Sequence, residues 1–429
     1  MLPEMAKEKI LHGDYGEMLA SLYCCGEKEA VKKGRRLAGA VDGFEALFGK
    51  QLDAAIFSAP GRTEIGGNHT DHQGGRVLAA GVNLDAVAVA AKTGSAEIRV
   101  KSEGFPEDRI DVRDLAPKRD ERGTSAALLR GLCRGFADRG YKIGGFCAYT
   151  TSSVLAGSGL SSSAAFEVLL GTAMNQLFCG GALSPLAVAQ LGQYAENEYF
   201  GKPCGLMDQA ASAIGGFAEI DFSDAANPRA EKIPFDFAKC GCRLCMVNTK
   251  GSHSDLTPDY AAIPAEMKQA AACFGKKLLS QVDEAEFYAR IPEVRAAAGD
   301  RAVLRAMHFF ADNRRVSQEA DALKAGDFDS FKRFIIESGR SSFEYLQNVY
   351  SPSHVAEQGV SIALALCERL LAPCGGAWRV HGGGFAGTVQ AFVPEGFLPE
   401  FTRQMEAVFG PGSCLPLAVR PVGGTQIAG

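Results

Sequence analysis

No apolar stretch in the sequence approaches the roughly 18 residues that a membrane-spanning helix needs. The first residues, MLPEMAKEKILHGDYGEM, are charged and lack the apolar core of a secretion signal. Lysine and arginine number 45 against 50 aspartate and glutamate residues, and the net charge of -5 lacks the basic excess typical of nucleic-acid-binding proteins. We therefore expect a cytoplasmic protein with no membrane partner and no nucleic-acid partner.

Metal-binding patterns and the common nucleotide-binding motif are also missing. The sequence CGCRLC at 240–245 is the only cluster among 13 cysteines, and no second pair of cysteines or histidines stands at zinc spacing. An odd number of cysteines, several inside apolar runs, is typical of buried thiols in a reducing compartment. The Walker A pattern GxxxxGK[ST] occurs nowhere. These absences argue against a zinc module, a disulfide framework and a P-loop enzyme.

The 429 residues are enough for two domains that share a cleft. Amphipathic spacing predicts helices over 1–52, 125–139, 164–178, 185–200 and most of 261–345. Alternating or β-branched segments predict strands at 54–59, 77–93, 96–104, 108–115, 145–152, 217–222, 242–248 and 388–393. The mixture predicts an α+β protein with a change of domain between residues 215 and 240.

The segment VLAGSGLSSSAAFEV, Val154 to Val168, carries the strongest signal for ligand binding. Its glycines let the backbone approach an anion closely, and its serines add hydroxyls. The helix expected from Ala164 turns its N-terminal amides toward this loop, and such amides bind phosphate. A serine-capped helix after an ordinary loop is the alternative.

Two further segments have less common features. HGGGFAG, His381 to Gly387, contains a formal GxGxxG, but a strand-like TVQAFVP follows where a dinucleotide fold needs a helix. We therefore expect a backbone turn packed against another glycine-rich loop, and a dehydrogenase is disfavoured. Asp208 lies in the apolar frame GLMDQAA, where a carboxylate needs a partner, and Arg62 is the natural candidate.

Taken together, these segments resemble the GHMP kinases and, within them, the galactokinases. The order is an APGR-led signature, GLSSSA, GLMDQ and GGGFAG, with RAMHFFADNRRV at 305–316 in between, and the resemblance covers about residues 52–395. It implies an N-terminal ribosomal-protein-S5-domain-2-like domain and a C-terminal ferredoxin-like α/β sandwich, with the active site between them. The expected limits are a helical extension at 1–52, an N-terminal domain at 53–228 and a C-terminal domain at 229–429.

The resemblance also implies a role for each matching residue. Asp208 is the proton acceptor at the anomeric hydroxyl of the sugar, and Arg62 lies between it and the transferred phosphoryl group. Ser163 and Glu196 hold magnesium. The residues expected to cradle the ATP phosphates are Gly157, Ser158, Gly159, Leu160, Ser161, Ser162 and Ser163. The residues expected around the sugar are Asn68, His69, Thr70, Asp71, Gly205 and Tyr260. The implied protein is a monomer that converts galactose and ATP into galactose 1-phosphate.

The sequence departs from the family signature GRxNLIGEHTDY at several positions. Glu64 replaces asparagine, Asn68 replaces glutamate and His72 replaces tyrosine, while His381 stands where a small hydroxyl residue is usual. In the family signature, the glutamate at position 68 is interpreted as accepting a hydrogen bond from the sugar hydroxyl on carbon 6. Because asparagine has no charge and can also donate, Asn68 widens the range of expected substrates. The alternatives are therefore a kinase for another galactose-like sugar, such as an amino sugar, a uronic acid or another pyranose, or a sugar sensor without turnover.

Overall fold

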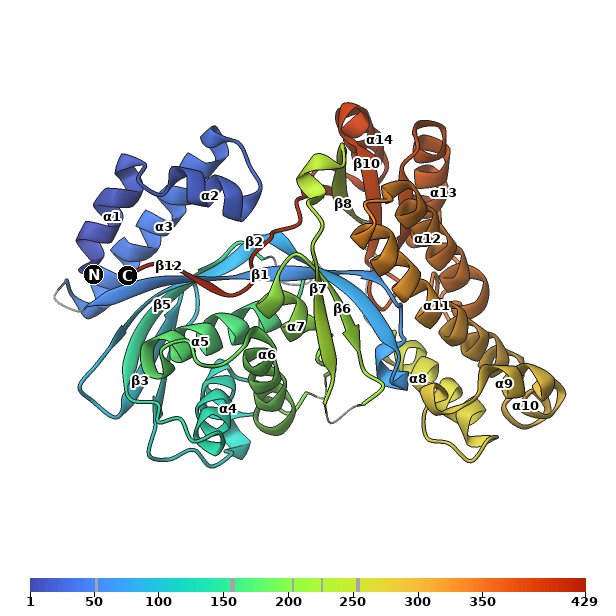
Figure 1. Ribbon diagram of the computed structural model, residues 1–429, viewed down its shortest axis with the longest axis horizontal. Coiled ribbons are helices and arrows are strands. Elements are labelled where there is room, and N and C mark those ends of the chain that lie inside the picture. The colour runs from blue at the N-terminus through green and yellow to red at the C-terminus, as the bar shows by residue number, and fades with distance from the viewer. Residues whose placement is uncertain (51–52, 155–158, 203, 225–226, 252–254) are drawn as a thin grey trace. The chain divides into compact units, whose positions relative to one another are not determined.

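The computed structural model describes residues 1–50, 53–154, 159–202, 204–224, 227–251 and 255–429. Their contacts divide the chain into two compact units (Figure 1). The first unit comprises 1–62, 81–216 and 419–429, and the second comprises 63–80 and 217–418. The units alternate along the chain because strands β1 (Ala54–Gly66) and β2 (Arg76–Lys92) each contribute residues to both. The domain limits at residues 52 and 228 stay a prediction.

The first unit contains a sheet in the order β12-β1-β2-β5-β3-β4. Strands β2 and β5 are antiparallel, with Val87 opposite Thr151, whereas β5 and β3 are parallel. Successive residues of β2 point to opposite faces, as strand geometry requires. The remaining strands are β3 (Glu97–Ser102), β4 (Glu107–Asp111), β5 (Phe146–Ser152) and β12 (Thr425–Ala428).

Two groups of helices cover the two faces of this sheet (Figure 1). The N-terminal helices pack on the face of Val87, Val89 and Ile56, in one continuous core with Phe44 and Leu37. The predicted N-terminal extension is therefore part of the first unit. The N-terminal helices are α1 (Pro3–His12), α2 (Gly16–Tyr23) and α3 (Glu27–Phe48), and the other group is α4 (Ser125–Asp138), α5 (Ser162–Cys179), α6 (Pro185–Tyr194) and α7 (Met207–Ile214).

The second unit contains an antiparallel sheet in the order β11-β8-β10-β9, and a strand pair β6–β7 that extends from the first residues of β2. Helices α12 and α13 contact β9, and α11 packs against α8 and α12. The strands are β6 (Phe217–Asp221), β7 (Arg229–Ile233), β8 (Cys242–Asn248), β9 (Ala377–Val380), β10 (Thr388–Pro394) and β11 (Cys414–Leu417). The helices are α8 (Thr257–Ala272), α9 (Glu284–Ala289), α10 (Ile291–Ala298), α11 (Asp300–Lys324), α12 (Phe328–Ser341), α13 (Gly359–Leu371) and α14 (Leu398–Phe409).

The mixed α+β architecture is the predicted one, but one helix differs from its prediction. The single helix predicted at 185–200 consists of α6 followed by a π-helical turn, η3 (Ala195–Phe200). The carbonyl of Glu196 accepts from the N–H groups of both Gly201 and Lys202, at 2.9 and 3.2 Å, where this turn ends. Such π turns often occur at functional sites, and this one carries the predicted magnesium ligand Glu196.

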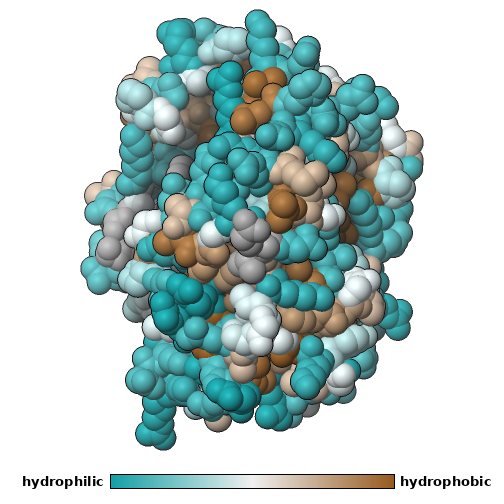
Figure 2. All heavy atoms as spheres, turned by 90° about the vertical axis from the view of Figure 1, so that its left-hand side faces the viewer, coloured by the Kyte–Doolittle hydropathy of each residue, from teal (hydrophilic) through white to brown (hydrophobic). Residues whose placement is uncertain are grey.

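Among the described residues, we find no helix with the length and apolar character that crossing a membrane requires. Figure 2 shows the face that carries the N-terminal helices. Hydrophilic residues dominate this face, and the hydrophobic ones lie in separate small groups without forming a continuous band.

Candidate active site

Asp208, at the start of α7, is held by Arg62, the partner that its apolar sequence context predicts. Nε of Arg62 donates to Oδ1 of Asp208 at 2.6 Å, and Nη2 donates to Oδ2 at 2.8 Å, so the ion pair is bidentate. The hydroxyl of Ser161 donates to the same Oδ2 at 2.6 Å. Nη1 of Arg62 also donates to the carbonyl of Gly159, at 2.5 Å. The carboxylate of Asp208 and its partner Arg62 thus link β1, α7 and the serine-rich loop, whose described residues before α5 are 159–161.

Gly61 allows strand β1 to lie directly against the serine-rich loop. The N–H of Arg62 donates to the carbonyl of Leu160 at 3.0 Å. A Cβ added at Gly61 would lie 2.9 Å from that same carbonyl oxygen, which is closer than real Cβ atoms come. The sequence therefore needs glycine directly before Arg62 for the ion pair to form beside the loop.

The carboxylate of Asp208 is kept in its ionised form. Burial alone would raise its pKa, but Arg62 and the hydroxyl of Ser161 outweigh burial and hold the pKa of Asp208 below its ordinary value. A carboxylate with a low pKa is a weak base. It can accept a proton only from a hydroxyl that the reaction has already made acidic.

The predicted phosphate loop ends at helix α5. Ser161 occupies the N-cap position with a left-handed backbone (φ 55°), and in the described part of the chain no side chain caps this helix. Because the hydroxyl of Ser161 is turned toward Asp208, the alternative of an ordinary serine-capped helix does not hold here. The first amides of α5 keep the positive potential that attracts an anion. Gly157 and Ser158 of the predicted cradle lie outside the described residues.

Glu196, the predicted magnesium ligand, lies in a polar cluster next to the Asp208 helix. Nε2 of Gln209 donates to both Glu196 and Glu167, at 2.9 Å each, and Nζ of Lys202 lies 3.4 Å from Glu196. Glu167 is fully buried, and its Oε1 has no hydrogen-bond partner in the described structure. Burial, together with the neighbouring carboxylate of Glu196, raises the pKa of Glu167 well above its ordinary value. The sequence pattern gave no sign of Glu167 or Gln209.

In the second unit, Asn68 of the signature is a buried link between several elements. Its Nδ2 donates to Oε1 of Glu64 at 2.9 Å and to the carbonyl of Gly382 at 2.7 Å. Its Oδ1 accepts from Asn348 at 2.8 Å and from Ser342 at 3.3 Å. All four hydrogen-bonding positions are thus used inside the unit, and the side chain is fully buried. This arrangement argues against the expected contact between Asn68 and a sugar hydroxyl.

The exchange between positions 64 and 68 accounts for this difference. Glu64 stands where the family has asparagine, and it forms a buried ion pair with Nη2 of Arg379 at 2.9 Å. Relative to the family signature, the carboxylate and the amide occupy each other's positions, and the two side chains are hydrogen-bonded to each other. The sequence showed both substitutions separately and gave no sign that they compensate each other.

The other residues predicted to contact the sugar differ in whether their polar side-chain atoms already form hydrogen bonds within the protein. Thr70 is fully buried and donates to the carbonyl of Gly67 at 2.8 Å. The hydroxyl of Tyr260 donates to the carbonyl of Gly384 at 2.9 Å, and burial raises the pKa of Tyr260 to about 12. Asp71 begins the turn η1 (Asp71–Gln73) and is half-buried, and Gly205 is exposed just before α7.

The loop HGGGFAG packs, as predicted, against the signature segment, which is the glycine-rich stretch 63–75 of the second unit. Nδ2 of Asn348 donates to the carbonyl of Gly383 at 3.1 Å, and Nδ2 of Asn68 donates to that of Gly382. The N–H of Phe385 donates to the carbonyl of Asn348 at 2.5 Å. Strand β10 follows the loop directly, which confirms that the formal GxGxxG is not a dinucleotide fingerprint.

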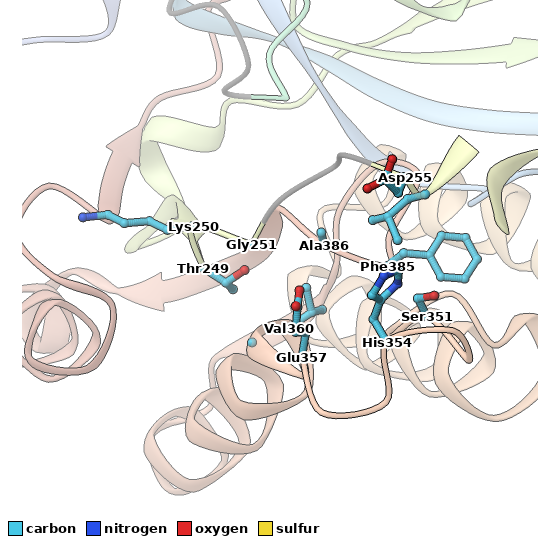
Figure 3. A pocket seen from close by; sticks show the side chains of 12 residues that line it. Thr249, Lys250, Gly251, Asp255, Ser351, His354, Glu357, Val360, Phe385 and Ala386 are labelled. Carbon is cyan, nitrogen blue, oxygen red and sulfur yellow. The ribbon is translucent and has the colours of Figure 1, made fainter. Parts of the chain in front are cut away.

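A cavity of about 390 Å³ lies beside this loop in the second unit (Figure 3). Phe385 and Ala386 form part of its wall, with His354 and Glu357 nearby, and the side chain of Lys250 points away from the others (Figure 3). Phe385, Lys250 and Asp255 all have left-handed backbones, with φ of 60°, 58° and 64°. Strained backbone of this kind often gathers near functional sites.

Comparison with known proteins gives two family matches. Residues 126–216 match the model of the GHMP kinases N terminal domain, and residues 42–92 match the galactokinase galactose-binding signature. The galactokinase of Streptomyces coelicolor is 32% identical over 381 residues, which cover 88% of this chain and 94% of that protein. Human galactokinase is 31% identical over 381 residues, covering 87% and 92%.

A solved structure, Lactococcus lactis galactokinase complexed with galactose, has the same fold, with a TM-score of 0.76 at 23% identity. It covers 91% of this chain and 100% of that one. The fold and the matched domain model define a GHMP kinase. Given relatives above 30% identity over most of their length, the chain belongs to the galactokinase family. It is thus a sugar kinase, and the resemblance seen in its motifs is confirmed.

Proposed function

We propose that this protein transfers the γ-phosphoryl group of ATP to the anomeric hydroxyl of galactose and releases galactose 1-phosphate. The observation that carries the proposal is the cluster of Arg62, Asp208 and Ser161 at the first turn of α5. The relatives from Streptomyces coelicolor and human are named galactokinases, and the Lactococcus lactis structure contains galactose.

Asp208 is the candidate proton acceptor, and Arg62 orients it. Phosphoryl transfer passes through a loose transition state, so positioning and charge neutralisation supply most of the catalysis. A weakly basic Asp208 suits a proton that leaves late, after bonding to phosphorus has made the sugar hydroxyl acidic. Arg62 keeps the carboxylate ionised and adds a positive charge beside the serine-rich loop.

We place the ATP phosphates at the segment 157–163. The uncapped first turn of α5 supports this, because its amides point toward the loop and its dipole favours an anion. Ser162 and Ser163 are half-exposed there. Leu160 is fully buried and contributes its backbone.

Magnesium would be held by Glu196 and Ser163. Magnesium prefers oxygen ligands and commonly uses one or two carboxylates together with substrate phosphates, and a glutamate with a serine hydroxyl fits that preference. The unsatisfied Oε1 of Glu167 adds a second buried carboxylate oxygen to the same cluster. When bound, the ion would neutralise charge on the phosphates. Glu196 and Gln209 keep their places through their mutual hydrogen bond.

We place the sugar at the signature segment of the second unit, where Asp71 and Tyr260 are the candidate contacts. Gly205, which belongs to the first unit, stays a prediction. Asn68 and Thr70 use their polar atoms within the protein, so we assign them to holding the segment in shape. The chemistry of a polyhydroxylated ring suits a segment with so few apolar side chains.

Another galactose-like sugar is the second candidate substrate. The exchange of Glu64 and Asn68 and the presence of His72 change the signature in the segment that is expected to bind the sugar. A sugar sensor without turnover is less well supported, because the Arg62–Asp208 pair is complete.

The test is ATP consumption by the purified protein across a panel of free monosaccharides. The panel contains galactose, glucose, galactosamine, N-acetylgalactosamine and galacturonate. We expect the highest kcat/KM with galactose. A higher value with an amino sugar or a uronic acid would support the second candidate, and no turnover with any sugar would leave a sensor.

A further inference from the structure

Four consecutive hydrogen bonds, which we call the histidine relay, run through the signature segment. The N–H of Leu279 meets Oε1 of Gln73 at 3.2 Å, and Nε2 of Gln73 lies 3.3 Å from Nδ1 of His72. Nε2 of His72 lies 3.3 Å from Nδ1 of His69, and Nε2 of His69 lies 3.1 Å from the carbonyl oxygen of Gly383. All five residues belong to the second unit.

The two groups at the ends of the histidine relay, the N–H of Leu279 and the carbonyl of Gly383, fix the direction of every hydrogen bond in it. A backbone N–H can only donate and a carbonyl oxygen can only accept. Nε2 of His69 must therefore carry the proton that it donates to Gly383, which leaves Nδ1 of His69 as an acceptor. His72 must then donate from Nε2, so its own Nδ1 accepts from Gln73. The amide of Gln73 is oriented consistently, since its Oε1 accepts from Leu279.

Both imidazole rings are neutral in this arrangement, and each is the Nε2–H tautomer. A second proton on Nδ1 of His69 would face the N–H of His72. Burial, with the neighbouring His72, lowers the pKa of His69 to about 3, in agreement with a neutral ring. The backbone of His69 is left-handed (φ 59°), a conformation that histidine adopts more readily than most residues.

The relay ends on the loop that packs against Tyr260. A Cβ added at Gly383 would lie 2.6 Å from Cε1 of Tyr260, so loop and ring are in close contact. The hydroxyl of Tyr260 donates to the next residue, Gly384. A shift of the Gly383 carbonyl would therefore move a residue that we place at the sugar.

We propose that His72 is a positioning residue for the sugar site: its N–H fixes the tautomer of His69, and His69 in turn holds the Gly383 carbonyl and Tyr260 in place. The proposal rests on the proposed function for its link to the sugar. Tyrosine, the residue of the family signature at this place, also has a donor, its hydroxyl. His72 thus keeps the donor and adds an acceptor for Gln73.

This arrangement also defines what His69 contributes. Both of its ring nitrogens are engaged within the protein. His69 would therefore shape the pocket without donating a hydrogen bond to a sugar hydroxyl.

Ring-¹⁵N-labelled histidine in the whole protein gives a direct test. Long-range ¹H–¹⁵N correlation spectra distinguish Nε2–H from Nδ1–H rings, and single substitutions assign the signals of the seven histidines. We expect His69 and His72 to be neutral Nε2–H tautomers at pH 7.5. An Nδ1–H or doubly protonated ring at either position would overturn the relay. This measurement needs no substrate, so it stands apart from any failure of the proposed function.

Kinetics on galactose test the positioning role. His72→Phe removes the donor, and we expect KM for the sugar to rise roughly tenfold while kcat stays within about twofold, since binding is lost equally in ground and transition states. His72→Tyr restores a donor and should stay within about threefold of the wild type. His12→Phe, at an exposed histidine, is the matched control. An unchanged KM in His72→Phe, or equal losses in the Tyr and Phe variants, would overturn the proposal.

Discussion

Asp208 is the side chain on which the proposed chemistry depends most. Replacement by asparagine keeps its size but removes the charge that accepts the proton. We expect Asp208→Asn to lower kcat by roughly 10²-fold or more, the scale of a lost general base, with nearly normal affinity for ATP. Steady-state kinetics and calorimetric titration with ATP measure the two effects. Asp42→Asn, at an exposed aspartate of the first unit, is the control, and wild-type turnover in Asp208→Asn would refute the assignment.

The exchanged pair Glu64 and Asn68 makes a second prediction about individual residues. Asn68→Glu brings two buried carboxylates together, and Glu64→Asn leaves the buried guanidinium of Arg379 without its carboxylate, a loss of about 3–5 kcal/mol. The double variant restores the family order, and we expect it to recover about 1–3 kcal/mol relative to the sum of the single losses. Thermal and urea unfolding of the four proteins measure this coupling, and strictly additive losses would contradict it.

Glu319 of α11 makes a prediction about pH. It is fully buried against Gly66, and neither carboxyl oxygen has a hydrogen-bond partner in the described structure. Burial, with the nearby Asp312, raises the pKa of Glu319 well above its ordinary value. The folded state therefore binds this proton more tightly than the unfolded state, and its contribution to stability is lost as pH rises above about 4.3 toward the folded-state pKa.

Glutamine is neutral at every pH, so Glu319→Gln removes this loss. We expect the variant to gain about 1–3 kcal/mol over the wild type at pH 8 and much less at pH 5. Thermal unfolding midpoints at both pH values are the measurement, with Glu8→Gln at an exposed position as control. A gain of the same size at both pH values would show that Glu319 does not carry the shifted proton.

Among the elements, the π turn η3 shows where sequence periodicity fails. An α-helix and a π turn differ by one residue in their hydrogen-bond spacing, and the apolar pattern of 185–200 fits either one. The turn sets the position of Glu196 beside Gln209, a contact between residues thirteen apart that no local pattern reveals. Most long helices and strands were predictable, because apolar residues recur at helical spacing, as in α4, or because β-branched residues gather in one run, as in β2. The short β7 has mostly exposed residues and gave no such pattern.

The same element makes a prediction about magnesium. Glu196→Gln removes the charge of the proposed ligand, and Ser163→Ala removes only a hydroxyl. We expect both variants to need more magnesium for half-maximal turnover, and the glutamate variant to need the most. Magnesium dependence of turnover and of ATP binding is the measurement. If neither dependence changes, the two residues have a structural role only.

For the whole molecule, the motifs predicted the family more reliably than the arrangement of the chain. The serine-rich loop, Arg62 and Asp208 were recognisable because each lies in a strong local context. The two alternating units were not, since a linear pattern does not show that 63–80 groups with residues beyond 216. The compensation between Glu64 and Asn68 was also hidden, because it depends on Arg379, more than three hundred residues away.

The most direct test of the central claim is the product formed from galactose and ATP. Purified protein with galactose, ATP and magnesium is followed by ³¹P and ¹H NMR. The account predicts stoichiometric ADP and galactose 1-phosphate, with the phosphate coupled to the anomeric proton, and a rate of product formation lower by roughly 10²-fold or more from Asp208→Asn under the same conditions. Phosphorylation at carbon 6, or ATP hydrolysis without a sugar phosphate, would contradict it.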